Sequence, residues 1–251
     1  MGSKRRRPIW KVILVAILLL AAIAFILDQL LPKPRIYPGF GVVIPEQYAI
    51  VGIDVSRYQG RIFWESVAAM KDQDRHIDFA FIKATEGETG IDSRFDYNWK
   101  AAGEALVPRG AYHYFHPAQN ASLQARNFLQ QTTGTTGNLR PVLDVEVLEN
   151  VDPRALRDSI CTWLTAVGNS FETAPIIYTN ASFYNQYLKG YFDDYPLWIA
   201  HYKAAKPAVR TDVQFWQFSD SGRVNGIAVP VDFNVFTGDR TALQELLLKE
   251  R

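Results

Sequence analysis

Four acidic residues stand at or near the ends of short apolar runs that are typical of β-strands. Asp54 closes the first such run, Asp144 and Glu146 close the fourth, and Asp232 lies in the eighth. A buried carboxylate is costly unless a partner or a reaction uses it. Cleavage of a glycosidic bond needs a proton donor for the leaving oxygen and negative charge near an oxocarbenium-like centre. Four acids with aromatic neighbours would suit that chemistry.

The pair Asp144 and Glu146 is the most informative of these positions. Side chains two residues apart on a strand point to the same face, at a Cα separation of about 6 to 7 Å. Two carboxylates this close in a sheltered cleft raise the pKa of at least one of them. A carboxylic acid that stays protonated near neutral pH can donate its proton to a leaving group. A single acid here would be better explained as a cap or a salt-bridge partner.

Strand-like and helical patterns alternate along the part of the chain that must position these acids. Strands are predicted at 49–55, 77–84, 110–115, 141–147, 174–178, 197–202, 213–218 and 228–235. Helices are predicted at 64–71, 95–106, 120–131, 152–168 and 241–249, with another begun by Asn180 or Ser182. Alternating units imply a parallel sheet with helices outside. We therefore predict an α/β fold: an irregular TIM-like (β/α)5(β)3 barrel, whose functional side chains lie at the C-terminal strand ends.

The N-terminal region has the pattern of a membrane anchor. Basic residues crowd positions 1–11, and residues 12–27 are sixteen uncharged apolar residues. We predict a cytoplasmic basic segment at 1–11, a transmembrane signal anchor at 12–31, a linker at 32–46 and a catalytic barrel at 47–251. The barrel would then lie on the periplasmic or extracellular side of the cytoplasmic membrane. Secretion after signal cleavage near Ala22-Ile23-Ala24 is the alternative.

Composition limits the other functions that the chain could have. The 251 residues carry a net charge of +1, so no global field predicts nucleic-acid binding. Cys161 is the sole cysteine, which excludes an intramolecular disulfide. Aromatic residues make up 13% of the chain, a content that fits either a large core or a sugar-binding cleft.

Eight short motifs follow one another along the chain. They are GIDVS at 52–56, FIKATEG at 81–87, GAYHYF at 110–115, LDVE at 143–146, IYT at 177–179, LWIA at 197–200, WQFS at 216–219 and VDFN at 231–234. This ordered set resembles the glycoside hydrolase family 25 muramidases, the Chalaropsis-type lysozymes. The resemblance covers roughly residues 49–240 and rests on the set rather than on any one motif.

The resemblance implies a function and roles for the acids. The family has an irregular barrel that loses helices late, and it hydrolyses the β-1,4 bond between N-acetylmuramic acid and N-acetylglucosamine in peptidoglycan. Glu146 would be the general acid/base. Asp144 would assist, either as nucleophile or by orienting the 2-acetamido group of the substrate. Asp54 and Asp232 would line the −1 subsite.

Further substrate contacts are predicted on the same strands. The candidates are Tyr112, Tyr114, Tyr178, Trp198, Lys83 and Gln217. Each aromatic residue could equally fill the barrel interior. Lys83 is expected to pair with an acid such as Asp54 or Glu86. His113 and His116 do not form a strong ligand pattern, so no metal or cofactor is predicted, and His113 is expected to be a cleft residue or a satisfied core histidine.

Two other functions compete with the muramidase. A non-catalytic glycan-binding scaffold on the same barrel would have little reason to keep four crowded acids. Another barrel enzyme, such as a chitinase or a deacetylase, is the third possibility, and a deacetylase would need a metal set. The favoured expectation is a monomeric hydrolase whose partners are peptidoglycan strands and, through the anchor, the membrane.

Overall fold

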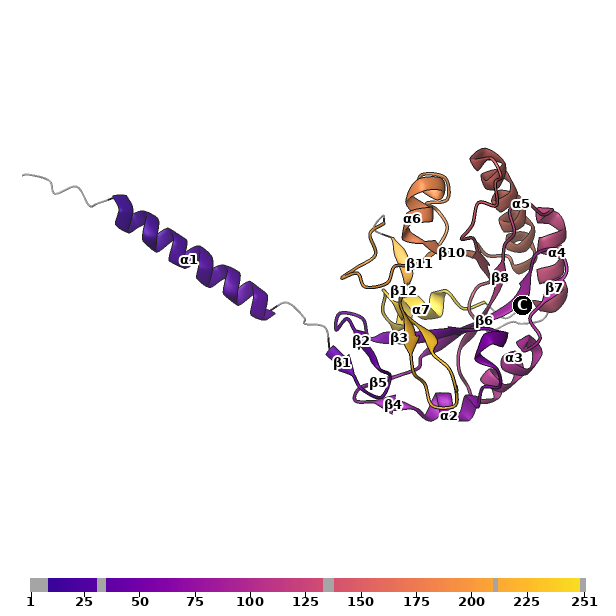
Figure 1. Cartoon of the computed structure of the whole chain (residues 1–251), viewed down its shortest axis with the longest axis horizontal. Helices are drawn as coiled ribbons and strands as arrows, with labels where there is room; N and C mark the ends of the chain where they lie inside the picture. The colour runs from indigo at the N-terminus through magenta and orange to yellow at the C-terminus, as the bar shows by residue number, and fades with distance from the viewer. Residues whose placement is uncertain (1–8, 31–34, 133–137, 210–211, 249–251) are drawn as a thin grey trace, which may run out of the picture.

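The computed structural model describes residues 9–30, 35–132, 138–209 and 212–248. Helix α1 (Ile9–Leu30) stands apart from the rest of the fold, and residues 13–27 of it are exposed (Figure 1). Within the residues that the structure describes, no helix combines the length and apolar character that crossing a membrane requires. The signal anchor at 12–31 stays a prediction. Residues 1–8 of the predicted basic segment and residues 31–34 lie outside the described residues.

Eight strands of the described chain close into a barrel, in the spatial order β3-β6-β8-β9-β10-β11-β12-β13 and back to β3. They are β3 (Ile50–Val55), β6 (Phe79–Glu86), β8 (Arg109–Tyr114), β9 (Val142–Asp144), β10 (Ile176–Asn180), β11 (Leu197–Ala200), β12 (Val213–Gly222) and β13 (Val231–Phe236). Neighbours are parallel, except that β13 is antiparallel to both β12 and β3. The short connection from β12 to β13 is the reason, because a parallel pair needs a long crossover.

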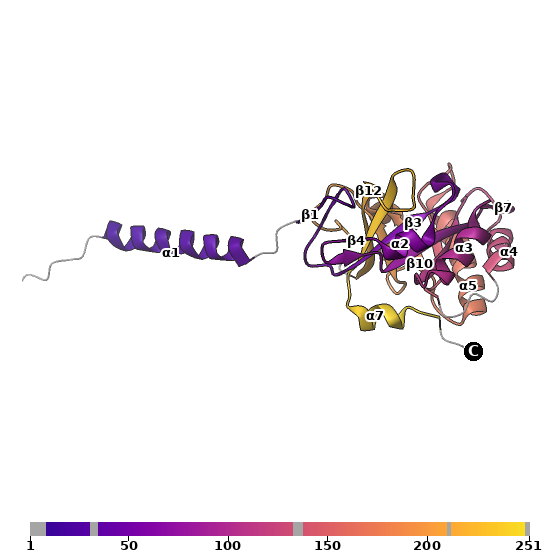
Figure 2. The same ribbon diagram turned by 90° about the horizontal axis from the view of Figure 1, so that it is seen from below.

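Helices follow the first five barrel strands and then stop, as the sequence pattern predicted. They are α2 (Trp64–Ala69), α3 (Phe95–Glu104), α4 (Ala121–Thr132), α5 (Pro153–Phe171), and α6 (Ala181–Phe183) with the π-helical turn η2 (Tyr184–Leu188). In the described chain no helix separates β11, β12 and β13. After β13 comes α7 (Arg240–Glu245), the short yellow helix in Figure 2. Asp152, the first residue of the helix predicted at 152–168, caps α5 by accepting from the backbone N–H of Arg154 and Ala155.

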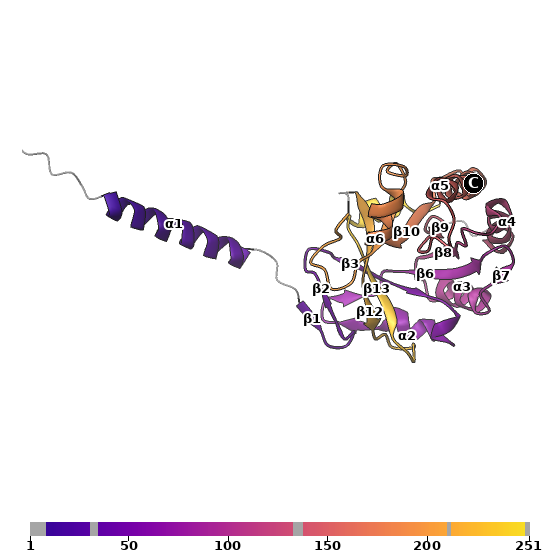
Figure 3. The same ribbon diagram turned by 45° about the horizontal axis from the view of Figure 1, so that its top comes forward.

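The outer face of the last strands is covered by a hairpin where a helix would otherwise lie. Strands β1 (Arg35–Tyr37) and β2 (Val42–Ile44) pair antiparallel. Tyr37 and Phe40 are buried, and the Phe40 ring lies 5.3 Å from that of Phe233 in β13. Figure 3 shows this hairpin beside β12, on the side of the barrel away from α3, α4 and α5. Residues 35–44, inside the linker predicted at 32–46, form this hairpin because their apolar side chains have a strand surface to cover.

Smaller elements complete the fold around the barrel. They are the 3-10 turn η1 (Arg57–Gln59) and the short strands β4 (Lys71–Asp72), β5 (Arg75–His76) and β7 (Gly90–Ile91). Aromatic rings fill the barrel interior: Phe79, Phe81 and Phe215 contact one another at centroid distances of 5.1 to 5.6 Å. Gly52 makes room for them, since a Cβ there would lie 2.4 Å from the Phe79 ring. These rings close the interior below the acidic strand ends.

Candidate active site

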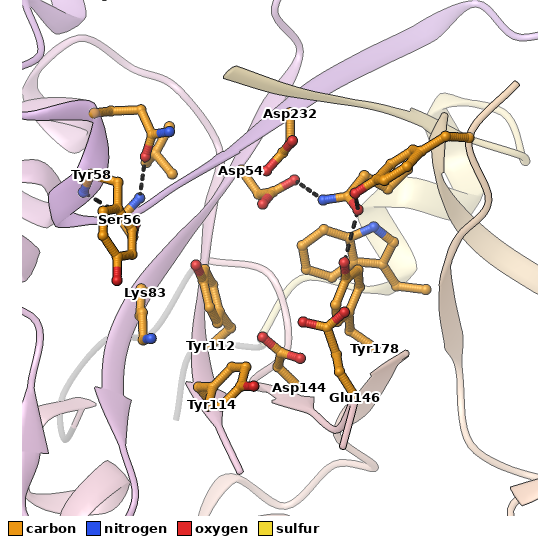
Figure 4. Close-up of a pocket in the computed structure, with 15 residues that line it drawn as sticks. Asp54, Ser56, Tyr58, Lys83, Tyr112, Tyr114, Asp144, Glu146, Tyr178 and Asp232 are labelled. Carbon is orange, nitrogen blue, oxygen red and sulfur yellow. Dashed lines mark hydrogen bonds between the residues drawn. The ribbon is translucent and has the colours of Figure 1, made fainter. Parts of the chain in front are cut away.

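One cleft of about 290 Å³ lies where the parallel barrel strands end and the antiparallel strand β13 begins (Figure 4). All ten residues that the sequence predicted for the site line it. They are Asp54, Lys83, Tyr112, Tyr114, Asp144, Glu146, Tyr178, Trp198, Gln217 and Asp232. The carboxyl ends of parallel strands meet at one end of a barrel, so residues far apart in sequence converge there.

Asp144 and Glu146 approach the cleft from β9 and from the loop that follows it. Asp144 is the last residue of β9 and is paired with Tyr114 of β8 and Tyr178 of β10. Glu146 lies beyond the strand, which ends three residues earlier than the predicted limit of 147. Asp144 is buried, with one carboxyl oxygen lacking a hydrogen-bond partner, whereas Glu146 is partly exposed. The predicted pair thus shares one cleft without sharing one strand.

The environment favours a proton on this pair. Burial raises the pKa of Asp144 well above its usual value, and the neighbouring charge of Glu146 adds to the effect. Burial also raises the pKa of Glu146, followed by the charge of Asp54, while Lys83 acts in the opposite direction. Because the two carboxyls interact strongly, the proton belongs to the pair. Both shifts favour retention of a proton on one member of the pair.

Asp54 is held by side-chain amides from the last strands. Its Oδ2 accepts from Gln217 Nε2 and from Asn234 Nδ2, both at 2.8 Å. The Gln217 carbonyl oxygen in turn accepts from the hydroxyls of Tyr178 at 2.8 Å and Tyr202 at 2.7 Å. Burial raises the pKa of Asp54 to about 6, against these hydrogen bonds, which lower it. The network orients Asp54 and leaves Gln217 little freedom.

Asp232 faces Asp54 across the antiparallel β13–β3 pair, as register partners. Burial raises the pKa of Asp232 to about 8, and the charge of Asp54 contributes next. Asp232 and Asp54 thus form a second carboxyl pair on the wall of the cleft opposite β9. The antiparallel course of β13 produces this arrangement.

The predicted aromatic contacts differ in how much surface they offer a sugar. Tyr112 and Tyr114 are partly exposed, so their rings can meet a ligand. Trp198 is 2% exposed, stacks on Phe81 at 4.4 Å and donates through Nε1 to Asn234 Oδ1 at 2.7 Å. Core packing, the alternative left open for every aromatic residue, describes Trp198 better than sugar contact does.

Lys83 and His113 have settled partners. Lys83 Nζ lies 2.6 Å from Glu86 Oε2 and 4.8 Å from the centre of the Tyr114 ring, so the expected pairing is with Glu86 rather than Asp54. His113 is buried, with its ring nitrogens 2.7 Å from Thr85 Oγ1 and 3.2 Å from Gln124 Oε1. Burial lowers the pKa of His113 to about 3. His113 is the satisfied core histidine, one of the two expectations for it.

The sequence did not single out every residue that shapes the site. The other residues that line the cleft are Val55, Ser56, Tyr58, Gln59 and Tyr202. Tyr58 is 73% exposed at the rim. Asn234 does not line the cleft, but its side-chain amide donates to Asp54. The motifs around Asp54 and Asp232 contain Ser56 and Asn234, which is the signal that could have found these two residues.

Fold and site together define a class of protein. An acidic cleft at the strand ends of an α/β barrel, with a proton-sharing carboxyl pair, is the arrangement of carboxylate-based glycoside hydrolases. Residues 53–227 match the family model of the glycosyl hydrolases family 25. The chain belongs to this family.

Two relatives of known sequence align with most of the chain. An uncharacterized protein of Escherichia coli K12, YegX, is 48% identical over 207 residues, which are 82% of this chain and 76% of YegX. Lysozyme M1 of Streptomyces globisporus is 33% identical over 213 residues, covering 78% of this chain and 71% of that enzyme.

Solved structures show the same barrel. The bacterial lysozyme of Streptomyces coelicolor superposes with a TM-score of 0.71 at 33% identity, over 79% of this chain and 96% of that one. A family 25 glycosyl hydrolase of Bacillus anthracis gives the same TM-score, 0.71, at 26% identity, over 80% and 95% of the two chains. The protein is a glycoside hydrolase of the lysozyme type.

Proposed function

We propose that this protein is a muramidase that hydrolyses the β-1,4 bond between N-acetylmuramic acid and N-acetylglucosamine in peptidoglycan. The observation that carries the proposal is the Asp144–Glu146 pair, two carboxyls with raised pKa values in one cleft. The names of its relatives, which include lysozymes, support the substrate class.

In the proposed mechanism Glu146 donates the proton to the leaving glycosidic oxygen. It is the more exposed member of the pair, so it can reach a bound substrate, and its raised pKa keeps a proton available. Asp144 supplies negative charge to the oxocarbenium-like centre, as nucleophile or by orienting the 2-acetamido group of the substrate. Glu146 then acts as the base that activates water.

Five other predicted residues bind the sugar or tune the charge of the pair. Asp54 and Asp232 face each other across the β13–β3 pair and would contact the −1 sugar. Tyr112 and Tyr114 offer partly exposed rings to the glycan. The positive charge of Lys83 lowers the pKa of both members of the catalytic pair, and so offsets part of the repulsion between their carboxylates.

We also propose that residues 12–31 anchor the enzyme, with the barrel on the outer side of the cytoplasmic membrane. The apolar run at 12–27 and the basic residues before it support this location. Cell fractionation tests the idea: the full chain should remain in the membrane pellet after alkaline extraction. Appearance of a shortened chain in the medium would instead indicate secretion after signal cleavage.

The function is tested by the new ends that the enzyme creates. The full chain, in mild detergent, is incubated with purified sacculi, and the released fragments are reduced and identified by mass spectrometry. Fragments whose reduced ends are N-acetylmuramic acid are expected. Reduced N-acetylglucosamine ends would contradict the bond specificity, and sacculus binding without release would favour the scaffold.

A further inference from the structure

The loop that carries Glu146 is only partly held by the barrel. Residues 145–152 lie between the end of β9 and the start of α5. The backbone N–H of Val145 donates to the Tyr178 carbonyl at 2.9 Å, which attaches the first residue of the loop to β10. Glu146 follows this residue and pairs with no neighbouring strand, so contacts outside the sheet must fix its position.

A tight turn begins two residues after Glu146, at Leu148. The backbone N–H of Val151 donates to the Leu148 carbonyl at 3.0 Å, closing a four-residue turn. Its two central residues, Glu149 and Asn150, have φ angles of +49° and +60°. Asparagine tolerates this left-handed region, but glutamate adopts it with strain. A strained residue persists where its surroundings hold it in place.

The side chain of Glu149 provides that hold. Its Oε1 lies 2.6 Å from His116 Nδ1, which must donate because a carboxylate only accepts. Its Oε2 accepts from the backbone N–H of Ala118 at 3.1 Å. The backbone of His116 is itself fixed by the Gln124 side chain. Its backbone N–H donates to Gln124 Oε1 at 2.9 Å, and its backbone carbonyl accepts from Gln124 Nε2 at 2.8 Å. Glu149 therefore ties the Glu146 loop to a rigid neighbouring loop.

We propose that Glu149 is a positioning residue, which sets the reach of Glu146 into the cleft by bridging the loop after β9 to the loop after β8. The inference rests on the proposed function of Glu146 and adds a specific support for it. Glu149 does not line the cleft. It acts through the backbone that it shares with Glu146, three residues away.

Two substitutions separate the bridge from the turn. Glu149→Gly removes the carboxylate and suits the left-handed backbone, so the fold should keep its thermal stability. The full chain with this change should lose about 10- to 100-fold in kcat on sacculi. KM should change little, because the substitution displaces the proton donor and leaves the residues that bind the glycan in place. Glu149→Gln keeps the acceptor oxygen and should recover most of the loss.

Glu172→Gly is the matched control. Glu172 also sits in the left-handed region, with φ +54°, at the C-cap of α5, the end of that helix remote from the Glu146 loop. Its replacement by glycine should leave kcat and KM unchanged. A Glu149→Gly enzyme with the parent kcat would overturn the proposal.

A crystal structure of the Glu149→Gly variant tests the positioning role independently of catalytic activity. We expect residues 146–150 to shift away from the His116 loop and the Glu146 carboxyl to move with them. An unmoved Glu146 would contradict the positioning role even if the proposed muramidase activity holds. If Glu146 moves in the variant but the parent protein releases no fragments from sacculi, the positioning role holds and the proposed muramidase function is rejected.

Discussion

At the scale of single residues, the cleft collects carboxyls in an environment that disfavours their charge. Asp54 and Asp232 are register partners, and burial raises their pKa values to about 6 and about 8. Such an arrangement is useful for chemistry and unfavourable for stability at neutral pH. The cost is offset by amide donors, such as Gln217 and Asn234, that hold one oxygen of Asp54.

This cost predicts a pH-dependent gain in stability for Asp232→Asn. A pKa raised from 3.8 to about 8 means that the folded state binds the proton more tightly than the unfolded state. The associated stability is complete below pH 3.8 and is lost as pH rises through about 8. The variant should therefore be about 1 to 3 kcal/mol more stable than the parent at pH 8, with a smaller gain at pH 4. Thermal unfolding at both values checks this, and a gain that is larger at pH 4 would contradict it.

At the scale of elements, the barrel interior depends on one close approach between strands. A Cβ on Gly52 in β3 would lie 2.4 Å from ring atoms of Phe79 in the parallel neighbour β6. Gly52→Ala should cost about 1 to 3 kcal/mol of folding stability through this overlap. Gly168→Ala, in α5, is the control: its nearest contact would be 3.3 Å and alanine favours the helix. Denaturant unfolding should separate the two, and equal stabilities would refute the packing argument.

The hairpin β1–β2 gives a second prediction for an element. Phe40 is fully buried against β13, whereas Ile36 is 65% exposed on the outer face of the hairpin. Phe40→Ala should cost about 3 to 5 kcal/mol, and Ile36→Ala should stay within about 0.5 kcal/mol of the parent. Chemical denaturation of the full chain measures both. A small effect of Phe40→Ala would mean that residues 35–44 are a linker after all.

At the scale of the whole molecule, the sequence predicted the barrel because several signals agreed. Apolar runs, the Asp152 cap and the absence of helical patterns between the last strands pointed to five βα units followed by three strands. The ten predicted site residues meet in one cleft because strand ends converge in a barrel. The end of β9 was missed, since Val145 and Glu146 continue a strand-like pattern where partner strands no longer pair.

Other features depended on contacts between distant segments, which no local pattern reports. The hairpin at 35–44 is rich in proline and glycine, and only the uncovered face of β12 and β13 explains why it packs. Asn234 enters the Asp54 network through the register of β13 on β3, and Tyr202 enters it from the turn after β11. Such registers follow from the closure of the whole barrel.

In the proposed mechanism Glu146 supplies the proton for glycan cleavage. The most direct measurement is the rate at which Glu146→Gln, in the full chain, releases fragments from sacculi, compared with the parent at equal concentration. The amide cannot donate a comparable proton, so the rate should fall at least about 100-fold while the melting temperature is kept. A folded Glu146→Gln protein that releases fragments at nearly the parent rate would contradict the role of Glu146 as proton donor.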